Sequence, residues 1–176
     1  YSDKVLAGYD ALIADFSKRK PEGNIAIFHG QQGSGKTWLV RALITHFRDY
    51  FFVLIPPKMV ACLMDPAFLS TVLRNRRYFP TVLIIEDADK ILIDRTEGDI
   101  DAISAALNLG DGIIGDMLDI RLIMTTNRKL PQMDKAIVRS GRLSGIIEIG
   151  AISRETAESS FRNLLPDARM PEFTEE

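Results

Sequence analysis

The chain has 176 residues, of which 46% are hydrophobic and 26% charged, and its formal net charge is −2 at pH 7. This composition is typical of one main globular domain and excludes extended disorder outside the acidic tail at 171–176, while the scattered lysines and arginines argue against a dedicated nucleic-acid-binding face. The single cysteine, Cys62, excludes an internal disulfide and a cysteine-rich metal site, which fits the cytoplasm or another reducing compartment without identifying an organelle.

Short apolar runs alternate with segments of helical spacing along the chain. The apolar runs predict five β-strands, at 25–29, 51–55, 82–85, 121–125 and 146–149. Helical spacing is found at 39–47, 68–74 and 100–107, and Asp65 followed by Pro66 predicts a helix start. Strands that alternate with helices form βαβ units, so we expect an α/β fold with a five-stranded parallel sheet covered by helices on both faces.

The stretch HGQQGSGKTWLV at 29–40 has the spacing G-x-x-x-x-G-K-[ST] of a phosphate-binding loop, between a predicted strand and a predicted helix. Its glycines allow backbone N–H groups to turn around a β-phosphate, and the helix start adds its positive dipole end. Lys36 is predicted to neutralise the β and γ oxygens of ATP, and the Thr37 hydroxyl to bind Mg²⁺. The alternative is an ordinary glycine-rich turn. The predicted nucleotide-binding residues are Gly30, Gln31, Gln32, Gly33, Ser34, Gly35, Lys36, Thr37 and Trp38.

The stretch TVLIIEDADK at 81–90 is an apolar strand that ends in Glu86 and Asp87. Side chains directly after a parallel strand emerge at the carboxyl edge of the sheet, where ligands bind in open α/β folds. One carboxylate is expected to orient Mg²⁺ and the other to polarise the water that attacks the γ-phosphate. Alternatively, Asp87 and Asp89 form an ordinary solvated helix start.

After Gly150 the predicted strands stop. The stretch SRETAESSFRNLLP begins with Ser153, a candidate N-cap, and continues with a helical pattern. We therefore expect a second, helical element that the end of the chain cuts short.

Four motifs occur in a fixed order: the phosphate loop, the acidic strand end, a polar residue at a strand tip and a pair of arginines. The last three read Glu86-Asp87-Ala88-Asp89, then RLIMTTN with Asn127 at its tip, then Arg139-Ser140-Gly141-Arg142. Over residues 25–150 this order resembles the AAA+ ATPases, and among them the AAA subgroup of ring-forming protein remodellers.

The resemblance implies roles for several residues. Asn127 would be the sensor that holds the attacking water or the γ-phosphate, with a simple strand-end turn as the alternative. Arg139 and Arg142 would be arginine fingers that reach the nucleotide of a neighbouring subunit, with two ordinary surface arginines as the alternative. Glu86 would be the metal-side carboxylate and Asp87 the catalytic base.

Two features depart from the usual pattern of that family. The order Glu86 then Asp87 is similar to that of the AAA proteins that assemble mitochondrial respiratory complexes and their bacterial relatives. This order shortens the side chain of the catalytic base. Because a displacement of about 1 Å can cost ~100-fold in rate, slow hydrolysis is expected. The stretch MDPAF at 64–68 lacks the aromatic-hydrophobic-glycine trio of a pore loop, and we expect Phe68 to be a core residue.

The resemblance implies a P-loop ATPase core at 1–150 and, at 151–176, the start of a truncated helical lid with an acidic tail. It implies Mg-ATP hydrolysis by a homo-oligomeric ring of six that remodels or translocates a protein of unknown identity. The alternatives are a nucleic-acid motor or loader, which would need a basic channel, and a slowly hydrolysing, nucleotide-gated assembly scaffold. Nucleic acid is not expected as a partner, and no apolar run approaches the roughly 18 residues of a membrane span.

Overall fold

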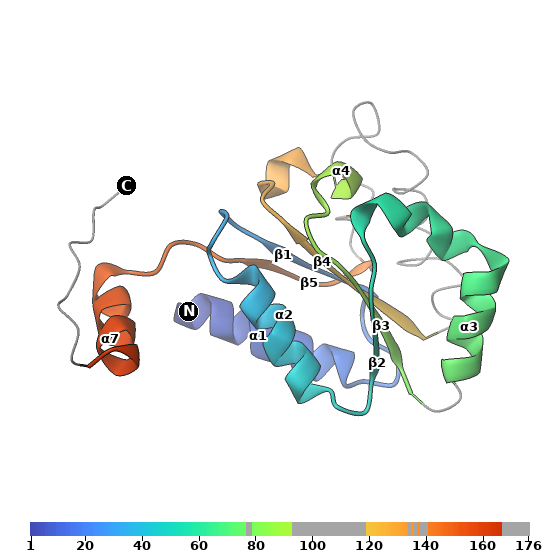
Figure 1. Cartoon of the computed structure of the whole chain (residues 1–176), viewed down its shortest axis with the longest axis horizontal. Helices are drawn as coiled ribbons and strands as arrows, with labels where there is room; N and C mark the ends of the chain where they lie inside the picture. Colours follow the sequence, from blue (N-terminus) through green and yellow to red (C-terminus); the bar gives the residue numbers. More distant parts are fainter. Residues whose placement is uncertain (77–78, 93–118, 134, 136, 138–140, 167–176) are drawn as a thin grey trace.

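The computed structural model describes residues 1–76, 79–92, 119–133, 135, 137 and 141–166. Its centre is a parallel sheet with the strand order β2-β3-β4-β1-β5 (Figure 1). The strands are β1 (Ile25–His29), β2 (Phe51–Leu54), β3 (Thr81–Ile85), β4 (Ile120–Thr126) and β5 (Leu143–Glu148). The helices are α1 (Asp3–Phe16), α2 (Lys36–His46), η1 (Pro57–Met64), α3 (Pro66–Arg76), α4 (Asp89–Leu92), η2 (Leu130–Gln132) and α7 (Arg154–Leu164).

Helices cover both faces of the sheet, because side chains of each central strand alternate between two apolar clusters. In β1, Ile25 and Ile27 belong to a cluster with residues of η1 and α3, whereas Ala26 and Phe28 belong to a cluster with residues of α1 and α2. Phe68 packs against the first cluster, as expected. The predicted α/β fold with a five-stranded parallel sheet is therefore confirmed.

The predicted strands differ from the observed ones mainly at their ends. The prediction for β1 agrees with the structure, but β5 begins three residues earlier than expected. The reason is that Leu143 and Gly145 pair with β1 although this stretch has no continuous apolar run. The predicted helix at 100–107 lies outside the described residues.

The sequence analysis did not predict α1. Its buried apolar residues, Val5, Leu12 and Phe16, are spaced at seven and four positions and form one stripe that packs on the α2 side of the sheet. The helical pattern is weak in the sequence because these residues are widely spaced and because exposed apolar residues such as Leu6 lie between them.

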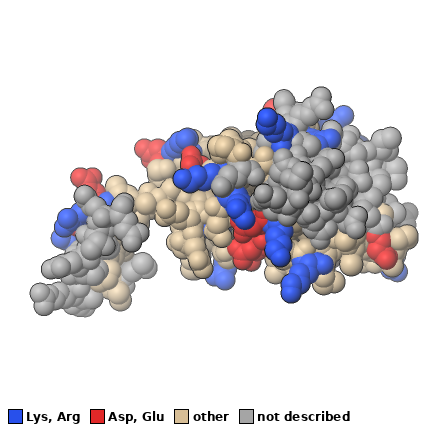
Figure 2. All heavy atoms as spheres, turned by 90° about the horizontal axis from the view of Figure 1, so that it is seen from above, with Lys and Arg blue, Asp and Glu red and all other residues tan. Residues whose placement is uncertain are grey.

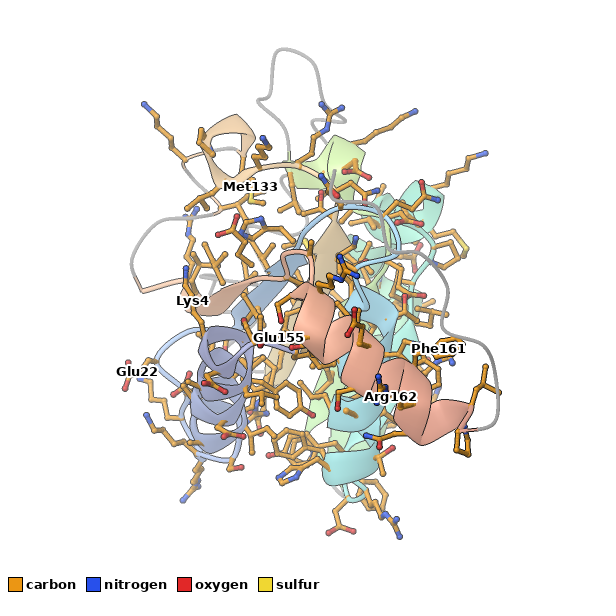
Figure 3. All side chains as sticks on the ribbon, turned by 90° about the vertical axis from the view of Figure 1, so that its left-hand side faces the viewer. Lys4, Glu22, Met133, Glu155, Phe161 and Arg162 are labelled. Carbon is orange, nitrogen blue, oxygen red and sulfur yellow. The ribbon has the colours of Figure 1, made fainter. Side chains whose placement is uncertain are left out.

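Two predicted helix starts are confirmed. The Asp65 carboxylate accepts a hydrogen bond from the Ala67 N–H at 2.7 Å, directly before α3. The Ser153 hydroxyl accepts one from the Thr156 N–H at 3.2 Å and caps α7. This last helix stands apart from the sheet in Figure 1, and Figure 3 shows its residues Glu155, Phe161 and Arg162. Among the described helices, none has the length and apolar character needed to cross a lipid bilayer.

Candidate nucleotide-binding site

The loop between β1 and α2 has a backbone that only glycine adopts easily. Gly30, Gly33 and Gly35 have φ angles of 157°, 80° and 99°. A Cβ atom on Gly30 would lie 2.1 Å from the carbonyl oxygen of Ile149, so this position also requires a close approach of two backbones. The glycine pattern in the sequence therefore corresponds to a tightly curved loop at the carboxyl end of β1.

The Lys36 side chain is folded into this loop. Its ammonium group donates hydrogen bonds to the carbonyl oxygens of Gly30 at 2.9 Å and Gln31 at 2.7 Å, and to Oδ1 of Asn127 at 2.9 Å. Burial lowers the pKa of Lys36, although the nearby carboxylates of Asp87 and Asp89 act in the opposite direction. A buried ammonium that is held by neutral acceptors gains electrostatic energy when phosphate oxygens replace them.

Thr37 and Glu86 meet beside this lysine. The Thr37 hydroxyl donates a hydrogen bond of 2.8 Å to Oε1 of Glu86. A hydroxyl and a carboxylate are oxygen ligands of the kind that Mg²⁺ takes together with phosphates and waters. The buried Ser34 hydroxyl has no hydrogen-bond partner among the described residues, as expected of a loop built to receive polar oxygens. These residues fit a magnesium-bound phosphate group.

Asp87 has an unusual backbone conformation. Its φ is 53°, in the left-handed region that Asp and Asn tolerate better than longer side chains do. Its N–H donates to the Thr125 hydroxyl at 3.1 Å, and the Ala88 N–H donates to the Thr125 carbonyl at 2.8 Å. The exposed Asp87 side chain therefore lies on a turn that is hydrogen-bonded to β4, and the positive φ of this turn favours aspartate over longer side chains.

A second connection joins the ends of β3 and β4. Oδ1 of Asp89 accepts hydrogen bonds from the Thr126 hydroxyl at 2.7 Å and the Asn127 N–H at 3.1 Å. Asp89 therefore holds the strand tip from which Asn127 reaches Lys36. The sequence analysis missed this positioning role and that of Thr125. The two hydroxyls directly before Asn127 were the available signal, but their partners follow only from the adjacency of β3 and β4.

An open cleft with a volume of about 650 Å³ lies next to the loop. It is lined by His29, Gly30, Gln31, Asn127, Arg128, Lys129, Glu148, Ile149, Gly150 and Ala151. Burial lowers the pKa of His29, while Glu148 raises it and the positive charges of Lys36 and Lys4 lower it. The cleft gives a ligand direct access to the start of the loop.

Two aromatic side chains lie at the other end of the loop. The Trp38 side chain is 67% exposed, and the Arg41 guanidinium lies 5.1 Å from its ring centre. The Tyr1 hydroxyl donates a 2.7 Å hydrogen bond to the Gly35 carbonyl. Trp38 is thus accessible to a ligand bound at the start of α2. Gln31, Gln32 and Gly33 are also exposed.

Arg142, the described member of the arginine pair, is not brought to this site. Arg139 lies outside the described residues. Arg142 directly precedes β5, and its carbonyl accepts a 2.9 Å hydrogen bond from the Ile25 N–H, at the amino end of β1. The phosphate loop follows the carboxyl end of β1, which has five residues. At about 3.3 Å per residue, the Arg142 backbone and the loop are roughly 15 Å apart along the strand.

The structure thus brings together five predicted site residues from three strand ends: Lys36, Thr37, Glu86, Asp87 and Asn127. Lys36 contacts Asn127, and Thr37 contacts Glu86. The catalytic roles of these residues remain predictions.

The chain matches the family model described as "ATPase family associated with various cellular activities (AAA)" over residues 26–151. It is 27% identical over 147 residues to the ATPase family gene 2 protein of Saccharomyces cerevisiae, a match that covers 79% of this chain and 18% of that protein. It is 30% identical to 26S proteasome regulatory subunit 6A of the same yeast, with 81% and 34% covered. It is also 30% identical to the proteasome-activating nucleotidase of Methanoregula boonei, with 78% and 33% covered. The chain therefore spans at most about a third of the length of these relatives.

Proposed function

The chain belongs to the AAA family of ATPases, and on this premise we propose that it binds Mg·ATP at the loop of Lys36 and hydrolyses it with carboxylates from the end of β3. The contacts of Lys36 with Asn127 and of Thr37 with Glu86 support this site most directly, because they join the phosphate loop to both strand ends.

Binding begins with an exchange of partners at Lys36. Its ammonium leaves Asn127 and the loop carbonyls for the β- and γ-phosphate oxygens, which carry more negative charge. Thr37 and Glu86 supply oxygen atoms for the metal. When bound, Mg²⁺ would offset part of the negative charge of the phosphates.

In the chemical step, the oxygen of a water attacks the γ-phosphorus while the bond from that phosphorus to the β–γ bridging oxygen breaks. Asp87 accepts a proton of this water, and the products are ADP and phosphate. The Asn127 amide, released by Lys36, orients the water or the γ-phosphate. Because the side chain of Asp87 is shorter than that of a glutamate base, this chain hydrolyses ATP more slowly than family members that have glutamate at this position.

Arg139 and Arg142 act on the nucleotide of a neighbouring subunit. The separation of roughly 15 Å along β1 between Arg142 and its own phosphate loop supports this assignment, because the side chain cannot span it. A closed ring of six copies gives every site such a neighbour. Residues 1–150 form the ATPase core, and α7 begins a helical lid in 151–176.

The substrate of the ring is a protein, which it remodels or translocates. Support comes from two relatives, named as a proteasome regulatory subunit and a proteasome-activating nucleotidase. Figure 2 shows basic and acidic side chains interspersed over the described part of one face, which gives a nucleic-acid backbone little to bind there.

Steady-state phosphate release tests this proposal and separates it from an assembly scaffold that only binds ATP. We expect Mg-dependent turnover that is lost in Lys36→Ala. ATP binding without any turnover above the Lys36→Ala background, in assembled full-length protein, would favour the scaffold.

A further inference from the structure

The backbone that carries Arg142 is held unusually tightly at the amino end of the sheet. A Cβ atom on Gly23 would lie 2.3 Å from the carbonyl carbon of Leu143 and 2.6 Å from both the carbonyl carbon and the oxygen of Arg142. Backbone atoms cannot yield as a flexible side chain would. The turn after α1 therefore rests directly on the peptide group that follows Arg142, at a position where only glycine fits.

Asp15 fastens the same region with its side chain. Its carboxylate accepts a hydrogen bond from the Ser144 hydroxyl. The Glu22 N–H donates to both carboxylate oxygens, at 3.0 and 3.2 Å, and the Lys18 ammonium pairs with the carboxylate at 3.0 Å. Although burial raises the pKa of Asp15, these partners lower it below its ordinary value. The charged carboxylate thus joins three segments: the end of α1, the turn that contains Glu22 (labelled in Figure 3) and the start of β5.

We propose that Asp15 and Gly23 are positioning residues that fix the backbone of Arg142, and so aim its guanidinium at the neighbouring subunit. This role rests on the proposed function of Arg142 as an arginine finger in trans. Neither residue lies near the phosphate loop of its own subunit, because both contact the amino end of β5. Their loss should therefore impair what a subunit donates to its neighbour and spare what it does at its own site.

Mixed rings of full-length subunits separate donation from acceptance. Acceptor subunits carry Arg142→Ala and retain their own phosphate loop, and donor subunits carry Asp87→Asn, which is expected to bind ATP without hydrolysing it. An intact pocket then meets an intact Arg142 only where a donor subunit lies beside an acceptor subunit. Adding Gly23→Ala to the donor should lower the rescued rate at least 10-fold, because a displacement of about 1 Å can cost ~100-fold. Adding it to the acceptor should change the rate less than 2-fold.

The matched control is Gly8→Ala in the donor. Gly8 is also a glycine of the α1 region facing β5, but its Cβ would lie 3.5 Å from the Ile147 side chain, an ordinary contact. Rescue by this donor should equal that of the parent donor. Ser144→Ala in the donor is the milder second variant, since it removes one hydrogen bond of Asp15 without a steric clash, and it should lower rescue about 3- to 10-fold.

Three outcomes decide the matter. No rescue by the parent donor would overturn the proposed trans action of Arg142 itself. Normal rescue by the parent donor together with normal rescue by the Gly23→Ala and Ser144→Ala donors would overturn only the positioning role. Equal losses of rate with the variant in the donor and in the acceptor would assign these residues to stability alone. The same conclusion would follow if the Gly23→Ala chain did not fold while the Ser144→Ala donor gave full rescue.

Discussion

The ammonium of Lys36 lies 2.9 Å from Oδ1 of Asn127, so the phosphate loop and the tip of β4 are in direct contact. In the proposed function, phosphate oxygens of ATP replace Asn127 as a partner of this ammonium, which couples the arrival of phosphate to the release of the Asn127 amide.

From this coupling we expect Asn127→Ala to lower kcat about 100-fold, the usual effect of removing one preorganised donor at the site of developing charge. The same variant should bind ATP as tightly as the parent or more tightly, because Lys36 then loses a competing partner. Phosphate release and ATP affinity are measured on the same preparation. Loss of affinity in proportion to the loss of rate would contradict this separation of roles.

The two carboxylates after β3 should respond differently to amide substitution. Asp87→Asn should keep ATP affinity within about 3-fold and abolish hydrolysis, since an amide does not accept the proton of the attacking water. Glu86→Gln should weaken binding in the presence of Mg²⁺ more than in its absence. Equilibrium titrations with and without the metal distinguish the two, and trapping of ATP by Glu86→Gln alone would show that the roles are reversed.

The left-handed backbone of Asp87 predicts a stability difference between similar side chains. Asp87→Glu should lower the free energy of unfolding by about 1 kcal/mol, because a longer side chain tolerates positive φ less well. Asp87→Asn, the matched control, should be close to neutral. In a thermal melt the loss corresponds to roughly 2 to 4 °C. Equal melting temperatures for all three proteins would show that φ at this position does not select aspartate.

The lowered pKa of His29 predicts a dependence of stability on pH. Burial disfavours the charged imidazolium in the folded state. As the pH falls below 6.5, the ordinary pKa of histidine, the unfolded chain therefore binds more protons than the folded protein does. The stabilisation is fully present above pH 6.5 and is lost as the pH falls from there through the lower pKa of the folded state. As the pH is lowered from 7.5 to 5, the denaturant midpoint of the parent should fall more steeply than that of His29→Gln. Parallel curves would mean that His29 titrates alike in both states.

The parts of the site that follow one another in the chain could be predicted from the sequence. The phosphate loop is a run of consecutive residues between a strand and a helix, and its lysine and threonine are where the motif places them. Glu86 and Asp87 are directly adjacent to an apolar strand, so their emergence at the carboxyl edge required no knowledge of strand order.

Contacts between distant segments could not be predicted in this way. The bond of Asp89 to Thr126 requires β3 and β4 to be neighbours, and the contact of Gly23 with Arg142 joins residues more than a hundred positions apart. Neither leaves a periodic or compositional signal. The stripe of α1 was missed for a related reason, since it is recognisable only against the sheet that it covers.

Calorimetric titration of Mg·ATP into the parent and Lys36→Ala proteins tests the central claim, that the loop around Lys36 is the nucleotide site, most directly. We expect one site per subunit in the parent and an affinity about 100-fold lower in the variant, because roughly 3 kcal/mol of charge-assisted hydrogen bonding to the phosphates is lost. Circular dichroism of both proteins verifies that the variant is folded. Equal affinities in two folded proteins would place the nucleotide elsewhere and contradict the account.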